Sequence, residues 1–434
     1  MSNKSTYNHT RPGGAHNPSS GAHSRPGGAH NPSSRAHTRP SGTRTQSSGG
    51  YNQSSEAHTR PSGAYTQPSG DHSRLSGTRT RPSGTRTCVS FMLLLAFSTT
   101  LLFAGCGNDS TVGSTVAEGD TLRVDSTEEA FTVVQLAGDL EHPWGMDWLP
   151  DGQLLITERP GRLNLFDGSQ MTRISGLPDI QAQSQGGLLD VKVHPDYGQN
   201  GWISFTWSSS VEGGGTGTAL SRARLNEGRD ELVDLELLYL QEPGYNSGRH
   251  FGSRIVMPGD GTLYFTIGDR GQGSPSQDLG NPAGSTIRLN EDGSIPDDNP
   301  FVDQEGALPE IWSWGHRNAQ GMTIHPETGE IWQHEHGPQG GDALNIIRKG
   351  ANYGWPDATY GHEYGDGSEI GIDPHEDPDV EDPITWWGPT SIAPSGMTFY
   401  FGSSFPGWEG DLFIGALLEE HLLRLEIEGD EVVH

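Results

Sequence analysis

Three features of the sequence predict an all-β fold of the β-propeller type. From about Thr121 onward, short runs of β-branched and aromatic residues alternate with Gly, Pro and Asp turns, which is typical of successive β-strands. The same region contains no amphipathic helical pattern of useful length. A phrase made of a proline turn, a glycine and a strand recurs along the chain at a spacing of about 50 residues or more. Small sheets repeated around an axis fit that spacing better than a β-sandwich does.

The repeats place a glycine just before each predicted strand. Successive glycines are 49, 60, 68 and 81 residues apart, so we expect growing insertions in loops on one face, around the central channel. The last repeat begins at Phe405 and the chain stops at His434, so we expect the final blade to be truncated, because a closed ring hides its sheet edges. In chain order the repeats read LPDGQLLITE, HPDYGQNGWISFTW, MPGDGTLYFTIGD, HPETGEIWQHEHG and FPGWEGDLFIGAL, with glycines Gly152, Gly201, Gly261, Gly329 and Gly410.

The first 105 residues differ from the rest in composition. Residues 1–87 contain almost no aliphatic side chains and include RPGGAHNPSS twice, so we expect a disordered, solvated tail whose histidines could alternatively bind metal. Residues 88–105 are apolar, follow a basic flank and lead into LFAGC, which predicts a signal cleaved before a lipidated Cys106. An uncleaved anchor, plain secretion and a start at Met92 are alternatives. Residues 106–121 then form a linker and residues 122–434 the propeller domain.

These features predict an exported protein, a periplasmic or cell-surface lipoprotein of a bacterium that meets the membrane only through its lipid. Residues 1–105 hold 11 Lys and Arg against 2 Asp and Glu, which leaves 16 basic and 54 acidic residues and a net charge of −38 for the remainder. Such a charge repels nucleic acid, so none is expected as a partner. Only Lys192 and Lys349 are lysines beyond residue 105, a bias that suggests a salty habitat. No cysteine follows Cys106, so redox chemistry would need a bound cofactor.

The stretch from Trp314 to Pro356 holds four His, two Arg, three Trp and eight Gly. It contains GHRNAQGM, HEHGPQGGD and KGANYGWP, and the chain also contains QGGLLDVKVHPDY, RLNEDGSIPDDNPF and IAPSGMTFY. Together these motifs resemble the pyrroloquinoline quinone (PQQ)-dependent soluble glucose and aldose sugar dehydrogenases, from about Gly138 to the C-terminus. The resemblance implies a six-bladed propeller that holds PQQ in its top-face channel, calcium on the cofactor, and hydride transfer from C1 of a sugar.

Four residues match family positions at the cofactor. His250, in GRHFGSRI, matches the general base, and histidine suits the removal of a hydroxyl proton near neutral pH. Arg317 and Asn318 match residues that contact PQQ, whose three carboxylates need focused positive charge and planar donors. Gln185, in SQGGLL, matches a channel residue near quinone and substrate. From residue type alone, His250 could instead cap a strand, Arg317 could form a surface ion pair and Gln185 could be a turn amide.

The metal positions follow from the same resemblance. Gly337 and Pro338 match residues whose backbone carbonyls hold the calcium that polarises the quinone. Tyr353 matches a ligand of a second calcium.

The sequence departs from the family pattern at two positions. Ala343 stands where a calcium-binding Glu is common, so the second calcium site is weakened or rebuilt from Asp342. Leu418 stands where a cofactor-binding lysine is usual, and the basic residues of the family's last blade would fall beyond the end of the chain. We otherwise expect His316, Asp342 and Asn352 to be structural.

We therefore expect an enzyme that oxidises aldose sugars at C1 to lactones. In that reaction His250 takes the hydroxyl proton, Arg317 stabilises charge on the reduced cofactor, and an external acceptor receives the electrons. A calcium-dependent propeller lactonase is one alternative, and a non-catalytic, calcium-binding surface propeller that binds sugar or protein is another. The loop 268–280 could shape the substrate entrance, whereas the acidic loop 366–383 lacks the spacing of a calcium loop and is expected to be solvated.

Overall fold

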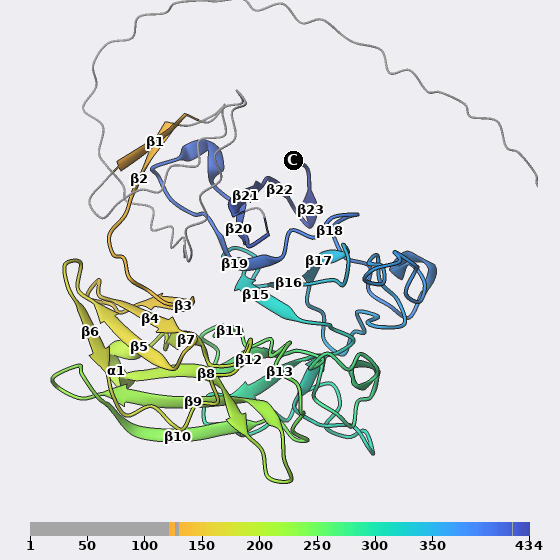
Figure 1. Ribbon diagram of the computed structural model, residues 1–434, viewed down its shortest axis with the longest axis horizontal. Helices are drawn as coiled ribbons and strands as arrows, with labels where there is room; N and C mark the ends of the chain where they lie inside the picture. The colour runs from red at the N-terminus through yellow and green to blue at the C-terminus, as the bar shows by residue number, and fades with distance from the viewer. Residues whose placement is uncertain (1–120, 126–129, 419) are drawn as a thin grey trace, which may run out of the picture. The chain divides into compact units, whose positions relative to one another are not determined.

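The computed structural model describes residues 121–125, 130–418 and 420–434, with side chains from residue 130 onward. The chain divides into two units, Met1–Pro82 and Ser83–His434, and all described residues belong to the second. The predicted tail, signal segment, lipidated Cys106 and nearly all of the linker therefore lie outside the described residues. The described part is a ring of β-sheets, so the predicted β-propeller is confirmed (Figure 1).

Five sheets, called blades 1 to 5, follow one another along the described residues. Each is an antiparallel meander in sequence order, and its first strand lies nearest the centre of the ring (Figure 1). The strands are β3 (Pro143–Trp148), β4 (Leu154–Glu158), β5 (Arg162–Phe166) and β6 (Met171–Ile174) in blade 1; β7 (Leu188–Val193), β8 (Trp202–Ser210), β9 (Thr216–Leu225) and β10 (Leu232–Leu240) in blade 2; β11 (Ile255–Val256), β12 (Thr262–Ile267), β13 (Ser285–Asn290) and β14 (Ile311–Ser313) in blade 3; β15 (Ala319–Ile324), β16 (Ile331–Glu335), β17 (Asp342–Ile346) and β18 (Thr385–Trp387) in blade 4; and β19 (Pro394–Phe399), β20 (Leu412–Ala416) and β21 (His421–Leu425) in blade 5.

The remaining elements are short. Two hairpins pair β1 (Thr121–Asp125) with β2 (Ala130–Val134) and β22 (Ile427–Glu428) with β23 (Glu431–Val432). No helix in the described part of the chain is long and apolar enough to cross a membrane. The helical segments there are α1 (Tyr197–Asn200), η1 (Ser274–Gln277), η2 (Pro374–Glu376) and η3 (Pro406–Trp408).

The predicted repeats mark the second strand of every blade. Their five glycines stand directly before, or two residues before, β4, β8, β12, β16 and β20. All five have a positive φ between 70° and 94°, which glycine adopts without strain. The strands that follow lie between other strands and between blades, so β4 (LLITE) and β12 (TLYFTI) are buried at every residue. Apolar, β-branched and aromatic side chains suit such positions.

Apolar clusters between successive blades hold the ring together. Each fully buried Leu or Phe side chain contributes about 1.5–3 kcal/mol to stability. The clusters include Leu163 and Phe205 between blades 1 and 2, Leu220 and Phe265 between blades 2 and 3, Tyr264 and Met322 between blades 3 and 4, and Trp332 and Leu412 between blades 4 and 5.

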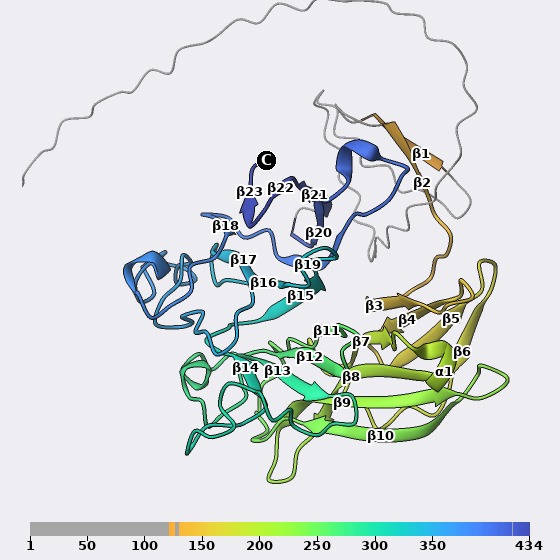
Figure 2. The same cartoon turned by 180° about the vertical axis from the view of Figure 1, so that it is seen from behind.

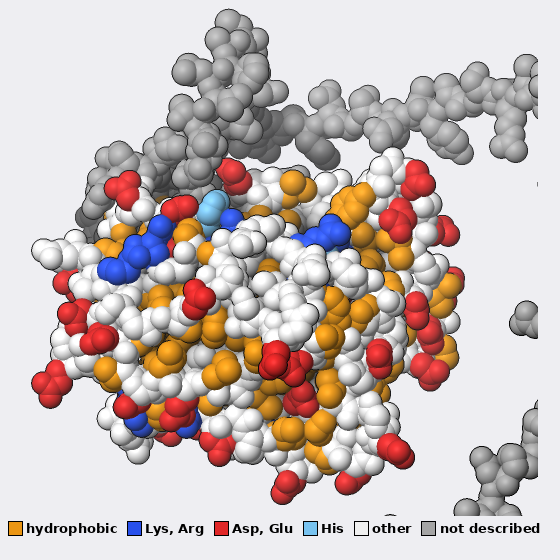
Figure 3. Space-filling model, turned by 60° about the horizontal axis from the view of Figure 1, so that its bottom comes forward, with side chains coloured by type: hydrophobic (Ala, Val, Ile, Leu, Met, Phe, Trp, Pro, Cys, Tyr) orange, Lys and Arg blue, Asp and Glu red, His pale blue; other side chains and the backbone are white. Residues whose placement is uncertain are grey.

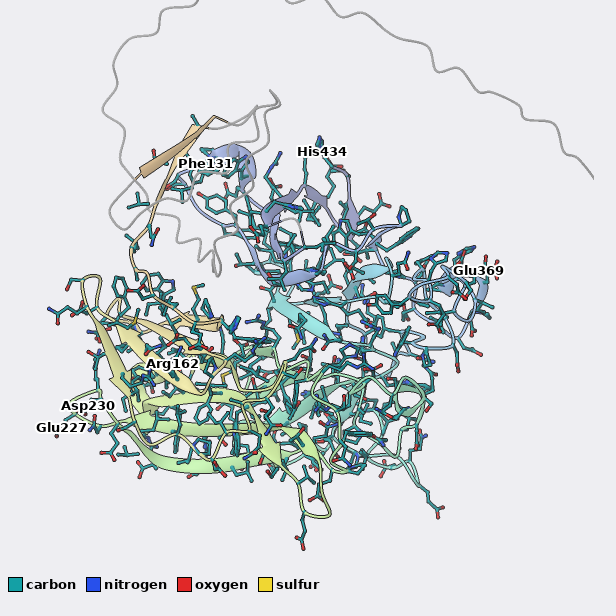
Figure 4. The ribbon with its side chains drawn as sticks, in the orientation of Figure 1. Phe131, Arg162, Glu227, Asp230, Glu369 and His434 are labelled. Atoms are coloured by element: carbon teal, nitrogen blue, oxygen red, sulfur yellow. The ribbon has the colours of Figure 1, made fainter. Side chains whose placement is uncertain are left out.

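A single segment, residues 131–140, connects the two ends of this row of blades. Phe131 on β2, labelled in Figure 4, packs edge-to-face on Trp408 beside blade 5, and the ring centroids are 5.6 Å apart. Leu136 and Leu140 then cover Leu154 of blade 1. Figure 2 shows the same connection between β2 and β3 from behind. The resemblance implies six blades, whereas the described residues form five, and the segment that connects the end blades begins in the two-stranded β1–β2 sheet.

Candidate active site

Six of the seven predicted site residues lie in loops at one edge of the ring, and the seventh, Tyr353, lies in the long connection from β17 to β18. In a meander, the connections into the first strand and those from the second to the third strand leave from the same edge. Gln185 precedes β7, His250 precedes β11 and residues 317–318 precede β15. Residues 337–338 lie between β16 and β17. The fold therefore groups all of these residues on one face.

His250 is buried, and contacts from two other loops fix its backbone and its ring. Its N–H donates to Oε1 of Gln185 (2.8 Å), and the N–H of Gln185 donates to the carbonyl of Gly248 (2.8 Å). Its Nδ1 lies 2.6 Å from Oδ1 of Asp269. Its φ of +55° is left-handed, which costs a non-glycine residue about 1–2 kcal/mol, so these contacts hold it in a conformation that it would not adopt alone.

Asp269 belongs to the candidate site, although its residue pattern did not single it out in the sequence. Its carboxylate accepts hydrogen bonds from the N–H groups of Gly271 (2.6 Å) and Gly273 (3.2 Å) and from Nε1 of Trp355 (2.8 Å). Burial raises its pKa, but the hydrogen bonds from His250, Gly271 and Trp355 outweigh burial and lower it. Because Asp269 remains an ionised acceptor, Nδ1 of His250 carries the proton. The available sequence signal was an Asp followed by two glycines in GDRGQG.

The environment of His250 favours its neutral form. Burial lowers its pKa, the hydrogen bond to Asp269 raises it, and the charge of Arg317 lowers it again, with a net shift below the usual value. Its Nε2 makes no hydrogen bond with a described residue. A neutral imidazole with one nitrogen oriented by a carboxylate and the other nitrogen free is suited to general-base chemistry.

Arg317 lies near the His250–Asp269 pair, and its guanidinium forms no ion pair with a described carboxylate. Its N–H donates to Oε2 of Glu335 (2.6 Å) and its Nη1 to the carbonyl of His336 (3.0 Å). Its guanidinium lies 5.4 Å from the ring centroid of Trp355, and Nη2 lies 3.5 Å from the Tyr364 hydroxyl. The residue is 8 % exposed, and none of these partners to its guanidinium is a carboxylate. A buried, uncompensated guanidinium is suited to an anionic ligand.

Asn318 connects two of the loops. Its Oδ1 accepts the N–H of Gly252 (3.2 Å) and Nε2 of Gln320 (3.2 Å). Its backbone carbonyl accepts the N–H of His336 (3.0 Å). Asn318 therefore positions the loops of His250 and His336, and its side-chain amide nitrogen is the group left for a cofactor.

The loop of Gly337 and Pro338 fits a calcium ion. The N–H of Gly337 donates to Oδ1 of Asp342 (2.9 Å), which fixes the turn. The carbonyls of Gly337 and Pro338 accept no hydrogen bond from a described residue. Free carbonyl oxygens on a fixed turn are ligands that calcium accepts.

The second calcium position has fewer free groups that could bind a cation. The hydroxyl of Tyr353 donates to the carbonyl of Ile346 (2.7 Å) and accepts the N–H of Arg348 (2.8 Å), so its backbone carbonyl is the group left for a cation. Ala343, with Tyr353 and Arg317, lines a cavity of about 30 Å³, which is room for a water molecule or an ion. The described residues contain no group of three or more His, Cys, Asp or Glu suited to a metal.

The carboxylate of Asp342 is engaged in hydrogen bonds with two loops. Besides the N–H of Gly337, its carboxylate accepts the hydroxyl of Ser391 (2.5 Å) and the N–H groups of Ile392 (2.7 Å) and Ala393 (2.9 Å). The side chain is fully buried. Its oxygens are thus used to tie the 337–341 loop to the loop that leads into blade 5, which is the structural role expected of this residue.

The other residues singled out in the sequence have structural surroundings. His316 is buried and hydrogen-bonds with Ser313 (2.9 Å) and Glu335 (3.0 Å). Asn352 exchanges two hydrogen bonds with Gln277, each of 3.0 Å. Leu418 is 57 % exposed and brings no charge to the position where the family usually has lysine.

The fold and the site define a class: a propeller enzyme whose loops hold a carboxylate-oriented histidine beside a buried arginine. Comparison with known proteins agrees with this class. The chain belongs to the glucose/sorbosone dehydrogenase family, whose model matches residues 140–434, and it is accordingly an oxidoreductase of the sugar dehydrogenase type.

Individual relatives cover most of the described part. Aldose sugar dehydrogenase YliI of Escherichia coli is 41% identical over 304 residues, which are 68% of this chain and 81% of that protein. The apo structure of the soluble aldose sugar dehydrogenase from Escherichia coli superposes with a TM-score of 0.66 at 40% identity, over 69% of this chain and 86% of that chain. The PQQ-bound aldose sugar dehydrogenase of Streptomyces coelicolor superposes with a TM-score of 0.56 at 26% identity, over 69% of this chain and 81% of that chain.

Proposed function

We propose that this protein is a PQQ- and calcium-dependent dehydrogenase that oxidises aldose sugars at C1 to lactones and delivers the electrons to an external acceptor. The observation that carries the proposal is the buried His250–Asp269 pair beside the uncompensated guanidinium of Arg317. The names of relatives as aldose sugar dehydrogenases, one of them in a PQQ-bound form, support it. PQQ, when bound, accepts the hydride from the sugar carbon.

The protein's own residues handle the proton and the charge. Nε2 of His250 accepts the C1 hydroxyl proton while hydride leaves the same carbon. Asp269 holds the opposite ring nitrogen and offsets the positive charge that then develops on the imidazole. Arg317 supplies a fixed positive charge in a buried position, where electrostatic interactions are stronger than in water.

The cofactor and metal would be held by the residues whose donors and acceptors remain free. Arg317, Gln185 and the amide nitrogen of Asn318 would bind the carboxylates and carbonyls of PQQ. The carbonyls of Gly337 and Pro338 would bind calcium, which withdraws electron density from a carbonyl that it contacts. A propeller lactonase would instead need a cage of acidic and amide side chains around its metal, and the described residues hold no cluster of acidic ligands of that kind.

The six-bladed ring is also part of this proposal. Blades 1 and 5 are bridged by the segment 131–140, which begins in the two-stranded β1–β2 sheet, rather than by a four-stranded blade. Met146 and Trp148 on β3 of blade 1 remain 40% and 51% exposed. Large apolar side chains on the inner strand of an end blade are suited to packing against a further blade.

The test titrates the full chain with PQQ in the presence of calcium or of a chelator, while aldose-dependent dye reduction is followed. We expect activity only with both ligands. We expect His250→Gln to lower kcat by roughly 10²–10⁴-fold while quinone binding, measured by absorbance, is retained. The exposed His375, exchanged in the same way, is the matched control and should keep wild-type kcat. Failure of the wild-type protein to bind PQQ, or a fully active His250→Gln, would reject the proposal.

A further inference from the structure

A buried arginine behind the His250 loop has no part in the steps above. Arg270 has no exposed surface. Its Nη1 donates to the carbonyl of Arg249 (2.6 Å) and its Nη2 to the carbonyl of Ser247 (2.7 Å). Nη2 also lies 3.2 Å from Oγ1 of Thr216 on β9. One guanidinium therefore connects two of the three residues just before His250, Ser247 and Arg249, to blade 2.

The surroundings of Arg270 differ from those of an ordinary structural ion pair. Its hydrogen bonds go to carbonyls and a hydroxyl, and its Nε has no hydrogen-bond partner among the described residues. The guanidinium lies 3.4 Å from the ring centroid of Phe251, the residue after His250. Burial lowers the pKa of Arg270 to about 10. Burying a cation in this way is unfavourable, so the contacts that it makes to the 247–251 loop must be strong enough to hold it.

We propose that Arg270 is a positioning residue for His250, an inference that rests on the proposed role of His250 as the base. The left-handed backbone of His250 needs to be held from outside. Asp269 binds the imidazole ring, and Arg270 binds the chain that leads to it. Arg270 is itself left-handed, with φ of +56°, and this turn places one side chain on the imidazole of His250 and the next on the chain that precedes it. A planar fork with several donors binds two separate carbonyls in a way that a single ammonium nitrogen does not.

The test uses Arg270→Met, Arg270→Lys and a matched control. Arg288 on β13 of blade 3 is also a buried arginine whose Nε has no partner among the described residues, and it bonds Asp298 (2.6 Å) and Asn299 (3.1 Å) instead of the site. Arg288→Met therefore reports the general effect of removing such a side chain. The readouts are kcat and KM, the melting temperature, and the NMR titration of the His250 ring measured without cofactor.

We expect Arg270→Met to lower kcat by about 100-fold with KM within about twofold, because a displaced base misaligns the reaction. The pKa of His250 should rise toward its ordinary value, because a loosened loop exposes the ring to water. Arg270→Lys should regain about tenfold of the lost kcat. Arg288→Met should change the melting temperature alone.

Two results would overturn the positioning role. One is a folded Arg270→Met protein with wild-type kcat and a wild-type His250 titration. If Arg270→Met does not fold, wild-type kcat and a wild-type His250 titration in Arg270→Lys would overturn the role instead. The other is an Arg288→Met protein that reproduces the changes. The titration needs no activity, so an inactive wild type would reject the proposed function while leaving the positioning role to be decided by NMR.

Discussion

The carboxylate of Asp269 keeps the proton of His250 on Nδ1, and it also raises the pKa of His250. Asp269→Asn should remove both effects. The asparagine amide can donate to Nδ1, which would place the proton on Nε2, the nitrogen that must stay free, so we expect kcat to fall by roughly 10²–10⁴-fold. Activity requires neutral His250 and is lost as pH falls through its pKa. Asp269 raises that pKa, so its loss lowers the pKa further and moves the acid limb of the remaining activity to lower pH.

The measurement is kcat as a function of pH. Asp278→Asn, in the same loop but at an exposed position, is the control and should leave the profile unchanged. An acid limb that moves to higher pH in Asp269→Asn would contradict the assigned hydrogen bond.

At individual residues, the sequence pointed to those members of the candidate site that lie in a recognisable motif. His250, Arg317 and Gln185 lie in recognisable phrases, and the structure groups them on one face. Asp269 could not be predicted, because its contact with His250 depends on how the 269–273 turn folds back across 19 residues of chain. Asp342 was singled out by its place beside Ala343, and its four hydrogen bonds depend on a neighbouring loop that no local pattern predicts.

Two glycines at opposite ends of β12 should respond differently to alanine. A Cβ on Gly268 would lie 2.3 Å from the carbonyl oxygen of His250, whereas a Cβ on Gly261 would meet nothing within 4 Å. Gly261 has φ of +89°, so Gly261→Ala should cost about 1–2 kcal/mol of unfolding free energy and leave kcat unchanged. Gly268→Ala should cost about 1–3 kcal/mol and also lower kcat more than tenfold, because it displaces the base.

Urea unfolding and steady-state kinetics on both proteins make this comparison. Equal kcat values in the two variants would show that the approach of Gly268 to His250 has no role in positioning the base.

At the level of elements, the repeat glycines predicted where strands begin, because a turn with positive φ favours glycine whatever packs around it. Each of the five repeat glycines precedes a strand, as expected, and the structure shows that this strand is the second of its blade. The connection of the end blades had no such signal. It depends on Phe131 meeting Trp408, two residues with no shared motif, and apolar residues at that spacing carry no sequence pattern of their own.

The whole molecule carries a dense negative charge. Figure 3 shows Asp and Glu side chains spread over the visible face and few Lys or Arg among them. Screening reaches about 10 Å at 0.1 M salt and about 3 Å at 1 M, so we expect the melting temperature to rise by several degrees between these concentrations. Sodium and potassium chloride should act alike if screening is the cause. A melting temperature that does not depend on salt would remove the basis for a salty habitat.

The contact between Phe131 and Trp408 also sets an order of events during biosynthesis. Every cluster between blades joins sheets that are neighbours in the chain, so these can form one after another as the ribosome releases them. Phe131 cannot form its contact until Trp408, 277 residues later in the chain, has been synthesised. Closing so long a loop is slow compared with folding each sheet. A nascent chain stalled before Trp408 therefore has its early blades in place while the aromatic surface of β2 is still available to a chaperone.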